Sequence, residues 1–178
     1  MTSFFNAFET SPVPAPGPDA EAPEIFRGIY GMPMFVTIPS TKMADTQAFW
    51  EKGLGFFDLF SVPGALLHLR RWAFQDVLVV PQDAASNTIT EPNRRTDGPV
   101  LTVSFACVLS EIDGIAAACE RLRPGCTRGP VVQPWNSIEL IVDAPDGVRV
   151  VMTAARPVDP HAAEAQNLRE MGILGVPE

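Results

Sequence analysis

Apolar and polar positions in residues 30–82 predict one strand, one helix and then three more strands. The segment MPMFVTIPS (32–40) is a short apolar run followed by polar residues, which is typical of a strand. ADTQAFWEKGLGF (44–56) predicts a helix that ends at a glycine-marked turn. Three short apolar segments then predict strands, at 57–62 (FDLFSV), 65–72 (ALLHLRRW) and 76–82 (DVLVVPQ).

The same order recurs in residues 99–155. PVLTVSFACVL (99–109) predicts a strand, and SEIDGIAAACERLRPG (110–125) predicts a helix with its apolar residues on one face. Ser110 and Asp113 have the spacing of a capping box at the start of this helix. Three strands follow, at 128–134 (RGPVVQP), 137–143 (SIELIVD) and 148–154 (VRVVMTA). The chain therefore holds two tandem βαβββ modules, 30–82 and 99–155, and the polar segment 83–98 joins them.

The two ends of the chain differ from this repeat. Residues 9–24 are dense in Pro, Ala and acidic residues, so residues 1–29 are predicted to form a flexible arm without regular structure. Three phenylalanines near its start favour docking on this subunit or on a partner: Phe4, Phe5 and Phe8. Residues 156–178 are predicted to form a tail with a short helix at 159–172, which Asp159 caps.

The double βαβββ order resembles the vicinal oxygen chelate superfamily, which includes glyoxalases, extradiol dioxygenases and bleomycin-resistance proteins. AFWEKGLGF (48–56) is similar to the aromatic-rich helix end of that family, and VDAPDGVRVV (142–151) to its final hairpin. The resemblance implies one α+β domain over residues 30–155. In it, the two modules form a curved mixed sheet around a cleft, with the helices outside.

The final hairpin indicates which residues face that cleft. APDG suits a type I turn with Pro145 second and Gly147 left-handed. Three cross-strand pairs follow from such a turn: Asp143 with Arg149, Ile141 with Val151, and Glu139 with Thr153. The opposite face is wholly apolar and should pack on a helix; it consists of Ile138, Leu140, Val142, Val150 and Met152.

The same alternation selects residues in the other strands. We expect Phe35, Thr37 and Ser104 to point toward the cleft, and Met34, Val36, Ile38, Val103, Phe105 and Cys107 to pack inside. The candidate ligand-binding residues are Phe35, Thr37, His68, Trp72, Ser104, Trp135, Glu139, Arg149 and Val151.

Metalloenzymes of this superfamily take their ligands from the first and last strands of each module. Zn, Fe, Mn or Ni at those places needs donors such as His or Glu. The matching positions look like Pro33, Ser104 and Val151, and the four strands contain neither His nor Glu. The two histidines, His68 and His161, fall in a middle strand and in the tail. The sequence therefore predicts no metal and no cofactor.

Composition and net charge limit the classes of partner that the chain is expected to bind. A net charge of −8 argues against nucleic acid and permits attraction of a cationic ligand. No apolar run approaches the roughly 18–20 residues of a membrane span, and the start lacks the pattern of a secretory signal. Cys107, Cys119 and Cys126 lack metal-ligand spacing, and we expect the first two to be small buried hydrophobic residues. A cytoplasmic location is expected.

Two function classes remain open, with a protein-binding scaffold as a weaker third. In a metal-independent binding protein of the bleomycin-resistance type, the resemblance implies a homodimer that holds a flat, often cationic natural product or drug. Trp72 and Trp135 are then the stacking surfaces, and resistance by sequestration is the expected role. The alternative is a metal-free cyclase, isomerase or epimerase that uses Glu139 or His68 as acid or base. Arg70 and Arg71 alternate faces, so one is expected to face solvent or the partner while the other could clamp an anion.

Overall fold

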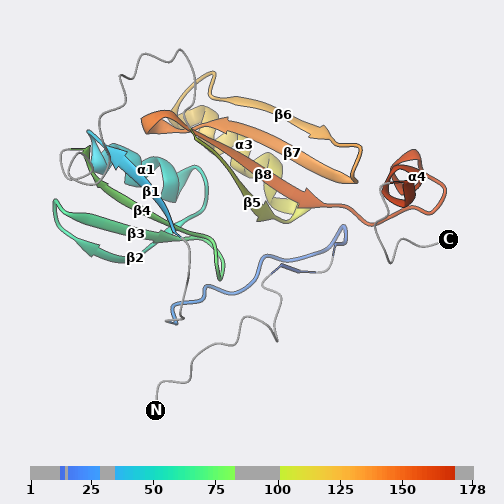
Figure 1. Cartoon of the computed structure of the whole chain (residues 1–178), viewed down its shortest axis with the longest axis horizontal. Helices are drawn as coiled ribbons and strands as arrows, with labels where there is room; N and C mark the ends of the chain where they lie inside the picture. Colours follow the sequence, from blue (N-terminus) through green and yellow to red (C-terminus); the bar gives the residue numbers. More distant parts are fainter. Residues whose placement is uncertain (1–12, 15, 29–34, 83–100, 171–178) are drawn as a thin grey trace.

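Two βαβββ modules follow one another along the chain, as predicted (Figure 1). The computed structural model describes residues 13–14, 16–28, 35–82 and 101–170. The first module consists of β1 (Val36–Ser40), α1 (Met43–Lys52), β2 (Phe57–Val62), β3 (Leu66–Arg70) and β4 (Asp76–Pro81). The second consists of β5 (Leu101–Cys107), α3 (Leu109–Leu122), β6 (Thr127–Val132), β7 (Ser137–Asp143) and β8 (Val148–Ala155), and α4 (Ala163–Glu170) lies in the tail.

Hydrogen bonds divide the eight strands into two four-stranded sheets, ordered β1-β4-β3-β2 and β5-β8-β7-β6. In each sheet the first and last strands of the module run parallel, and the other neighbours run antiparallel. The predicted α+β class with mixed sheets is confirmed.

One face of each sheet carries the core. Helix α1 packs against β2, β3 and β4, and α3 packs against β6, β7 and β8. The alternation predicted from sequence holds along most of the inner strands, although Ile138 is only half-buried and Arg70 and Asp76 are buried on the opposite face. The helix-facing residues include Ile38, Leu69, Val77 and Val79 in the first module and Phe105, Leu140, Val142, Val150 and Met152 in the second.

Three aromatic rings join the two modules. Trp50 on α1 is fully buried, and its ring meets Phe56 at 4.8 Å between centroids and Phe105 of β5 at 6.1 Å. Phe56 and Phe105 meet at 5.2 Å, and all three pairs are edge-to-face. Such pairs contribute about 0.5–1.5 kcal/mol each beyond the area they bury. The buried residues of both modules therefore form one continuous core.

Arg71 also holds together the interface between the two modules, which we call the joint, through hydrogen bonds. Its Nη1 donates to the carbonyl of Ala106 at 2.6 Å, its Nη2 to Glu111 Oε2 at 2.6 Å, and its Nε to the carbonyl of Leu54 at 3.2 Å. The expectation that Arg70 or Arg71 faces solvent is wrong, because both are buried, with exposed fractions of 2% and 4%. Burial is possible here because each guanidinium finds acceptors in the surrounding chain.

The predicted start of the second-module helix and its predicted capping box are also wrong. Helix α3 begins at Leu109 rather than at Ser110, and its first free backbone N–H, that of Val108, donates to Glu111 Oε2 at 3.2 Å. Ser110 is thus inside the helix, and its hydroxyl donates to the carbonyl of Ala20 in the arm at 3.3 Å. Asp113 has no capping role.

The β7–β8 turn is not of type I, because Asp146 as well as Gly147 is left-handed, with φ values of 63° and 73°. Aspartate tolerates this conformation better than most residues. Its carboxylate also accepts a hydrogen bond from the Thr46 hydroxyl on α1, which ties the turn to the first module.

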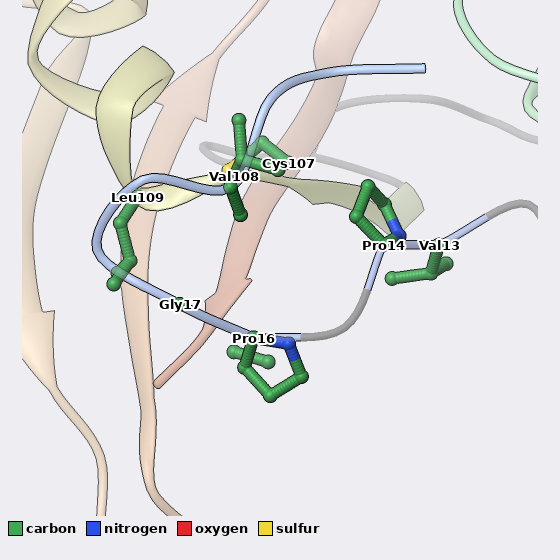
Figure 2. Close-up of a pocket in the computed structure, with 9 residues that line it drawn as sticks. Val13, Pro14, Pro16, Gly17, Cys107, Val108 and Leu109 are labelled. Carbon is green, nitrogen blue, oxygen red and sulfur yellow. The ribbon is translucent and has the colours of Figure 1, made fainter. Parts of the chain in front are cut away.

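The described part of the arm lies on its own chain. Residues 16–28 contain no helix or strand, as predicted, and they run past both modules (Figure 1). The carbonyls of Phe26 and Gly28 accept hydrogen bonds from Arg70 Nη1 at 3.2 and 2.8 Å. Near the start of the arm, Pro14 and Pro16 border a small hollow beside Cys107–Leu109 (Figure 2). The three arm phenylalanines (Phe4, Phe5 and Phe8) lie outside the described residues.

The other predicted features concern the tail and the cysteines. Helix α4 spans Ala163–Glu170, inside the predicted range 159–172, but Asp159 lies four residues before its start and accepts a hydrogen bond from His161 N instead of capping it. Cys107 and Cys119 are buried as expected, and desolvation raises the pKa of each thiol to about 12. Within the described ranges, no helix is long and apolar enough to cross a membrane.

We predict that Arg71→Met lowers the free energy of unfolding by about 2–4 kcal/mol, because it removes the cationic partner of Glu111 and one hydrogen bond each to the carbonyls of Leu54 and Ala106. Denaturant unfolding, followed by tryptophan fluorescence, measures the change. Arg128→Met is the matched control, since Arg128 is exposed and its ion pair with Asp143 should contribute less than about 1 kcal/mol. Equal effects of the two substitutions would contradict the role given to Arg71.

Candidate ligand-binding site

The faces of the two sheets that point away from α1 and α3 carry most of the predicted site residues. We call them the open faces. On the first sheet, Thr37, Leu78, His68 and Phe60 form one row across the four strands. Thr37 is exposed and His68 is half-buried. Phe35 is 40% exposed and meets the His68 ring edge-on at 5.5 Å.

The second sheet confirms the predicted cross-strand pairing. Asp143 pairs with Arg149, Ile141 with Val151, and Glu139 with Thr153. On the neighbouring strand, Ser104 pairs with Val151, and it is exposed. The open face of this sheet is thus polar at both ends and apolar in the middle, as the alternation predicted.

Trp135 lies at the tip of the turn between β6 and β7 and is 48% exposed. The turn is closed by hydrogen bonds from Asn136 N to Gln133 O at 3.1 Å and from Gln133 N to Ser137 O at 2.8 Å. Asn136 is left-handed, with φ 63°, which is common for the last residue of a three-residue hairpin loop. Its side-chain amide donates to the carbonyl of Arg156 at 2.9 Å, so the turn is also held by the chain leaving β8.

Trp135 and Glu139 contact each other. The indole Nε1 donates to Glu139 Oε1 at 3.1 Å, and the Ser137 hydroxyl lies 3.4 Å from the same oxygen. Among the described residues, none donates to Oε2, and the side chain of Glu139 is only half-buried. The pair therefore presents an indole ring next to a carboxylate oxygen that a ligand can reach.

A second charged group lies at the other end of the same face. Arg149 Nε and Arg128 Nη2 each donate to Asp143 at 2.8 Å. The hydrogen bond from Arg149 lowers the pKa of the Asp143 carboxyl, and Arg128 adds to the shift. With both guanidinium groups facing one carboxylate, the group carries a net positive charge.

His68 contacts a carboxylate on the first sheet. Its Nε2 lies 2.6 Å from Asp76 Oδ1, and Arg70 Nε donates to the same oxygen at 2.8 Å. The side chain of Asp76 is fully buried, while that of His68 is 18% exposed. Asp76 is not among the site residues predicted from the sequence. The β3–β4 register, which pairs Arg70 with Asp76, is the signal that would have predicted the contact.

Trp72 is the predicted site residue that the structure places elsewhere. It lies in the turn after β3 and is 3% exposed, with the Arg71 guanidinium 4.6 Å from its ring centroid. A ring buried in this way cannot stack on a ligand, so the prediction for Trp72 is wrong. The sequence shows an aromatic residue after a strand but not that its neighbour Arg71 turns inward and covers it.

The residues at the metal positions do not fit a metal. Ser104 of β5 pairs with Val151 of β8, and in the first sheet Thr37 of β1 pairs with Leu78 of β4. Aliphatic side chains offer no ligand atom, and neutral hydroxyls are poor substitutes for His, Cys or carboxylate. The described ranges contain no group of three His, Cys, Asp or Glu residues that could hold a metal ion. Pro33 lies outside these ranges.

The fold is similar to that of several solved structures. A glyoxalase/bleomycin resistance protein/dioxygenase from Nocardioides superposes with a TM-score of 0.55 at 14% identity, over 75% of this chain and 91% of that one. A family enzyme of the same description from Burkholderia phytofirmans PsJN gives 0.57 at 13% identity, over 68% and 96%. A lactoylglutathione lyase from Agrobacterium tumefaciens gives 0.52 at 18% identity, over 68% and 91%.

These comparisons show that the chain shares the fold of glyoxalase/bleomycin resistance/dioxygenase proteins, which is the fold that the resemblance in the sequence implied. At such identities the likeness extends to the fold alone. No protein-family model matches the sequence, and no curated protein matches it either.

The pKa of Asp143 predicts a pH-dependent contribution to stability. A lowered carboxyl pKa stabilises the folded state above the unfolded value of about 4, and this contribution is lost as the pH falls through the folded pKa. Asp143→Asn should therefore lower the free energy of unfolding at pH 7 by at most about 1 kcal/mol, because the ion pairs are partly exposed. Denaturation at pH 7 and near pH 2 should show this difference shrinking toward zero. A difference that grows in acid would contradict the assignment.

Proposed function

We propose that the protein binds a planar small molecule with a positive charge at Trp135 and Glu139. The observation that carries this proposal is the contact between an exposed indole and a half-buried carboxylate that keeps one oxygen without a described donor. A cation over an indole face gains about 0.5–2 kcal/mol, and a partly desolvated charge-assisted hydrogen bond gains about 1.5–3 kcal/mol. The net charge of −8 favours the approach of a cation.

The rigidity of the Trp135 turn supports this role. Asn136 is 8% exposed and anchors the turn to the chain after β8, while Asn167 of α4 donates to the carbonyl of Pro134 at 3.4 Å. A ring held in place before binding loses little conformational entropy when a ligand stacks on it. The tail helix, which had no predicted function, thus helps to position the candidate stacking residue.

We further propose that binding is independent of metal, since Ser104 and Val151, which match two of the superfamily's metal-ligand positions, offer a neutral hydroxyl and an aliphatic side chain. Elemental analysis of purified protein should then find no stoichiometric Zn, Fe, Mn or Ni, and chelator should leave the unfolding midpoint unchanged. About one such metal per chain would refute the proposal.

The binding proposal predicts that Trp135→Ala and Glu139→Gln each weaken a ligand at least about threefold, given the energies of a cation–π contact and a charged hydrogen bond. A thermal-shift screen of cationic planar natural products can supply the ligand, because binding to the folded state raises stability. Titration calorimetry then gives the affinities. Val132→Ala on the β6 edge, which is exposed but lies outside the Trp135–Glu139 contact, is the control.

Two results would overturn this proposal. If both variants bind as tightly as the wild type, Trp135 and Glu139 are not the site. If mass spectrometry finds the bound compound chemically altered by wild type and not by Glu139→Gln, the protein is a metal-free enzyme at this site rather than a sequestering protein.

A further inference from the structure

The open face of the first sheet carries a histidine and a buried carboxylate in contact, and the binding proposal uses neither. His68 on β3 pairs with Leu78 of β4, and Arg70 pairs with Asp76, so His68 and Asp76 are diagonal neighbours on one face. The 2.6 Å contact between His68 Nε2 and Asp76 Oδ1 therefore follows from the register of two rigid strands. Asp76 also accepts from Arg70, whose Nη1 is held by two arm carbonyls.

The hydrogen bonds assign the proton on the imidazole. A carboxylate only accepts hydrogen bonds and a guanidinium only donates them. Because Arg70 already donates to Asp76 Oδ1, the contact with His68 Nε2 requires the hydrogen on the histidine. The neutral ring is thus assigned the Nε2–H form, with the lone pair on Nδ1.

The His68 ring is partly exposed, and its neighbours in the row are mostly apolar. No described residue forms a hydrogen bond with Nδ1, and the side chain is 18% exposed. Phe35 stands edge-on to the ring at 5.5 Å, and Phe60, opposite His68 on β2, is 57% exposed. The paired Leu78 is half-buried. A flat apolar compound lying on these side chains would meet a basic nitrogen.

We propose that this face is a second site, separate from Trp135 and Glu139, at which His68 Nδ1 removes a proton from an acidic C–H or O–H of a planar, uncharged compound. Asp76 is a positioning residue that holds the ring in the reactive tautomer and stabilises the imidazolium that forms. Arg70 takes no part in ligand binding, because Asp76 and the arm occupy its guanidinium.

The step is balanced without a cofactor. The C–H or O–H bond breaks, its electron pair stays on the compound, and the proton moves to Nδ1. If the same proton returns to another carbon of the resulting anion, the product is an isomer and nothing is oxidised or reduced.

The test uses 5-nitrobenzisoxazole, a planar uncharged compound that opens when a base removes its C3 proton. The C–H electron pair forms the nitrile, the N–O bond breaks, and the phenolate product is followed by its absorbance. Wild type should open this probe at least about tenfold faster than His68→Gln, a modest value for general-base catalysis. His161→Gln should match the wild type because His161 lies in the tail, and Val132→Ala should match it because Val132 lies on β6 of the other sheet.

A tautomer measurement separates positioning by Asp76 from a structural effect. With only two histidines in the chain, a ¹H–¹⁵N correlation spectrum resolves both rings. Wild-type His68 should carry its hydrogen on Nε2 above its pH of protonation, and His68→Gln should retain the wild-type unfolding midpoint within a few degrees. In Asp76→Asn, an amide N–H that donates to Nε2 would move the hydrogen to Nδ1 and lower the rate in a folded protein.

Equal rates for wild type and His68→Gln overturn the proposal, as does a wild-type hydrogen on Nδ1. Both outcomes leave the binding proposal untouched, since Trp135 and Glu139 are tested on a different ligand and on the other sheet.

Discussion

The buried guanidinium of Arg71 is the interaction on which the arrangement of the two modules depends. Its donors need acceptors once they leave water, and these acceptors come from both sides of the joint: Leu54 from the first module, Ala106 and Glu111 from the second. The aromatic cluster of Trp50, Phe56 and Phe105 supplies apolar burial at the same joint. Apolar contacts are non-directional and allow the two modules to shift against each other. The hydrogen bonds of the planar guanidinium have fixed directions and therefore select one relative position of the modules. The joint therefore covers the helix-facing sides of both sheets and leaves their other faces open.

Those open faces could be predicted because they depend on a local rule. Side chains alternate along a strand, and one hairpin turn sets the pairing of its two strands. The pairs of Glu139 with Thr153 and of Asp143 with Arg149 follow from the sequence for that reason, although the turn itself has Asp146 in an unexpected left-handed conformation. The loop has the same length in either conformation, so the register is unaffected.

The burial of Arg70, Arg71 and Trp72 could not be predicted in this way. All three lie where β3 ends. Arg70 donates to nearby Asp76, but the other acceptors of the two arginines belong to segments distant in the chain: the arm, the residues after α1 and the β5–α3 junction. A hydropathy pattern places an arginine at the surface, because it carries no information on carbonyl acceptors that only the fold brings close to the side chain. Trp72 was misplaced as a consequence, since its ring is covered by the neighbouring guanidinium.

A chain of hydrogen bonds through Arg70 and Asp76 connects the arm to His68, the candidate base on the first sheet. Phe26 and Gly28 hold Nη1 of Arg70, Arg70 Nε donates to Asp76, and Asp76 accepts from His68. The side chain of Asp76 is fully buried, so a loss of Arg70 would remove a cationic partner from a buried carboxylate, which costs more than the net gain of a typical hydrogen bond. The arm, whose composition predicts no regular structure, thus helps to hold Arg70 and Asp76, the buried pair that orients His68. Its contribution depends on two backbone carbonyls, which every residue type carries, and for that reason the side-chain pattern of the arm gives no sign of it.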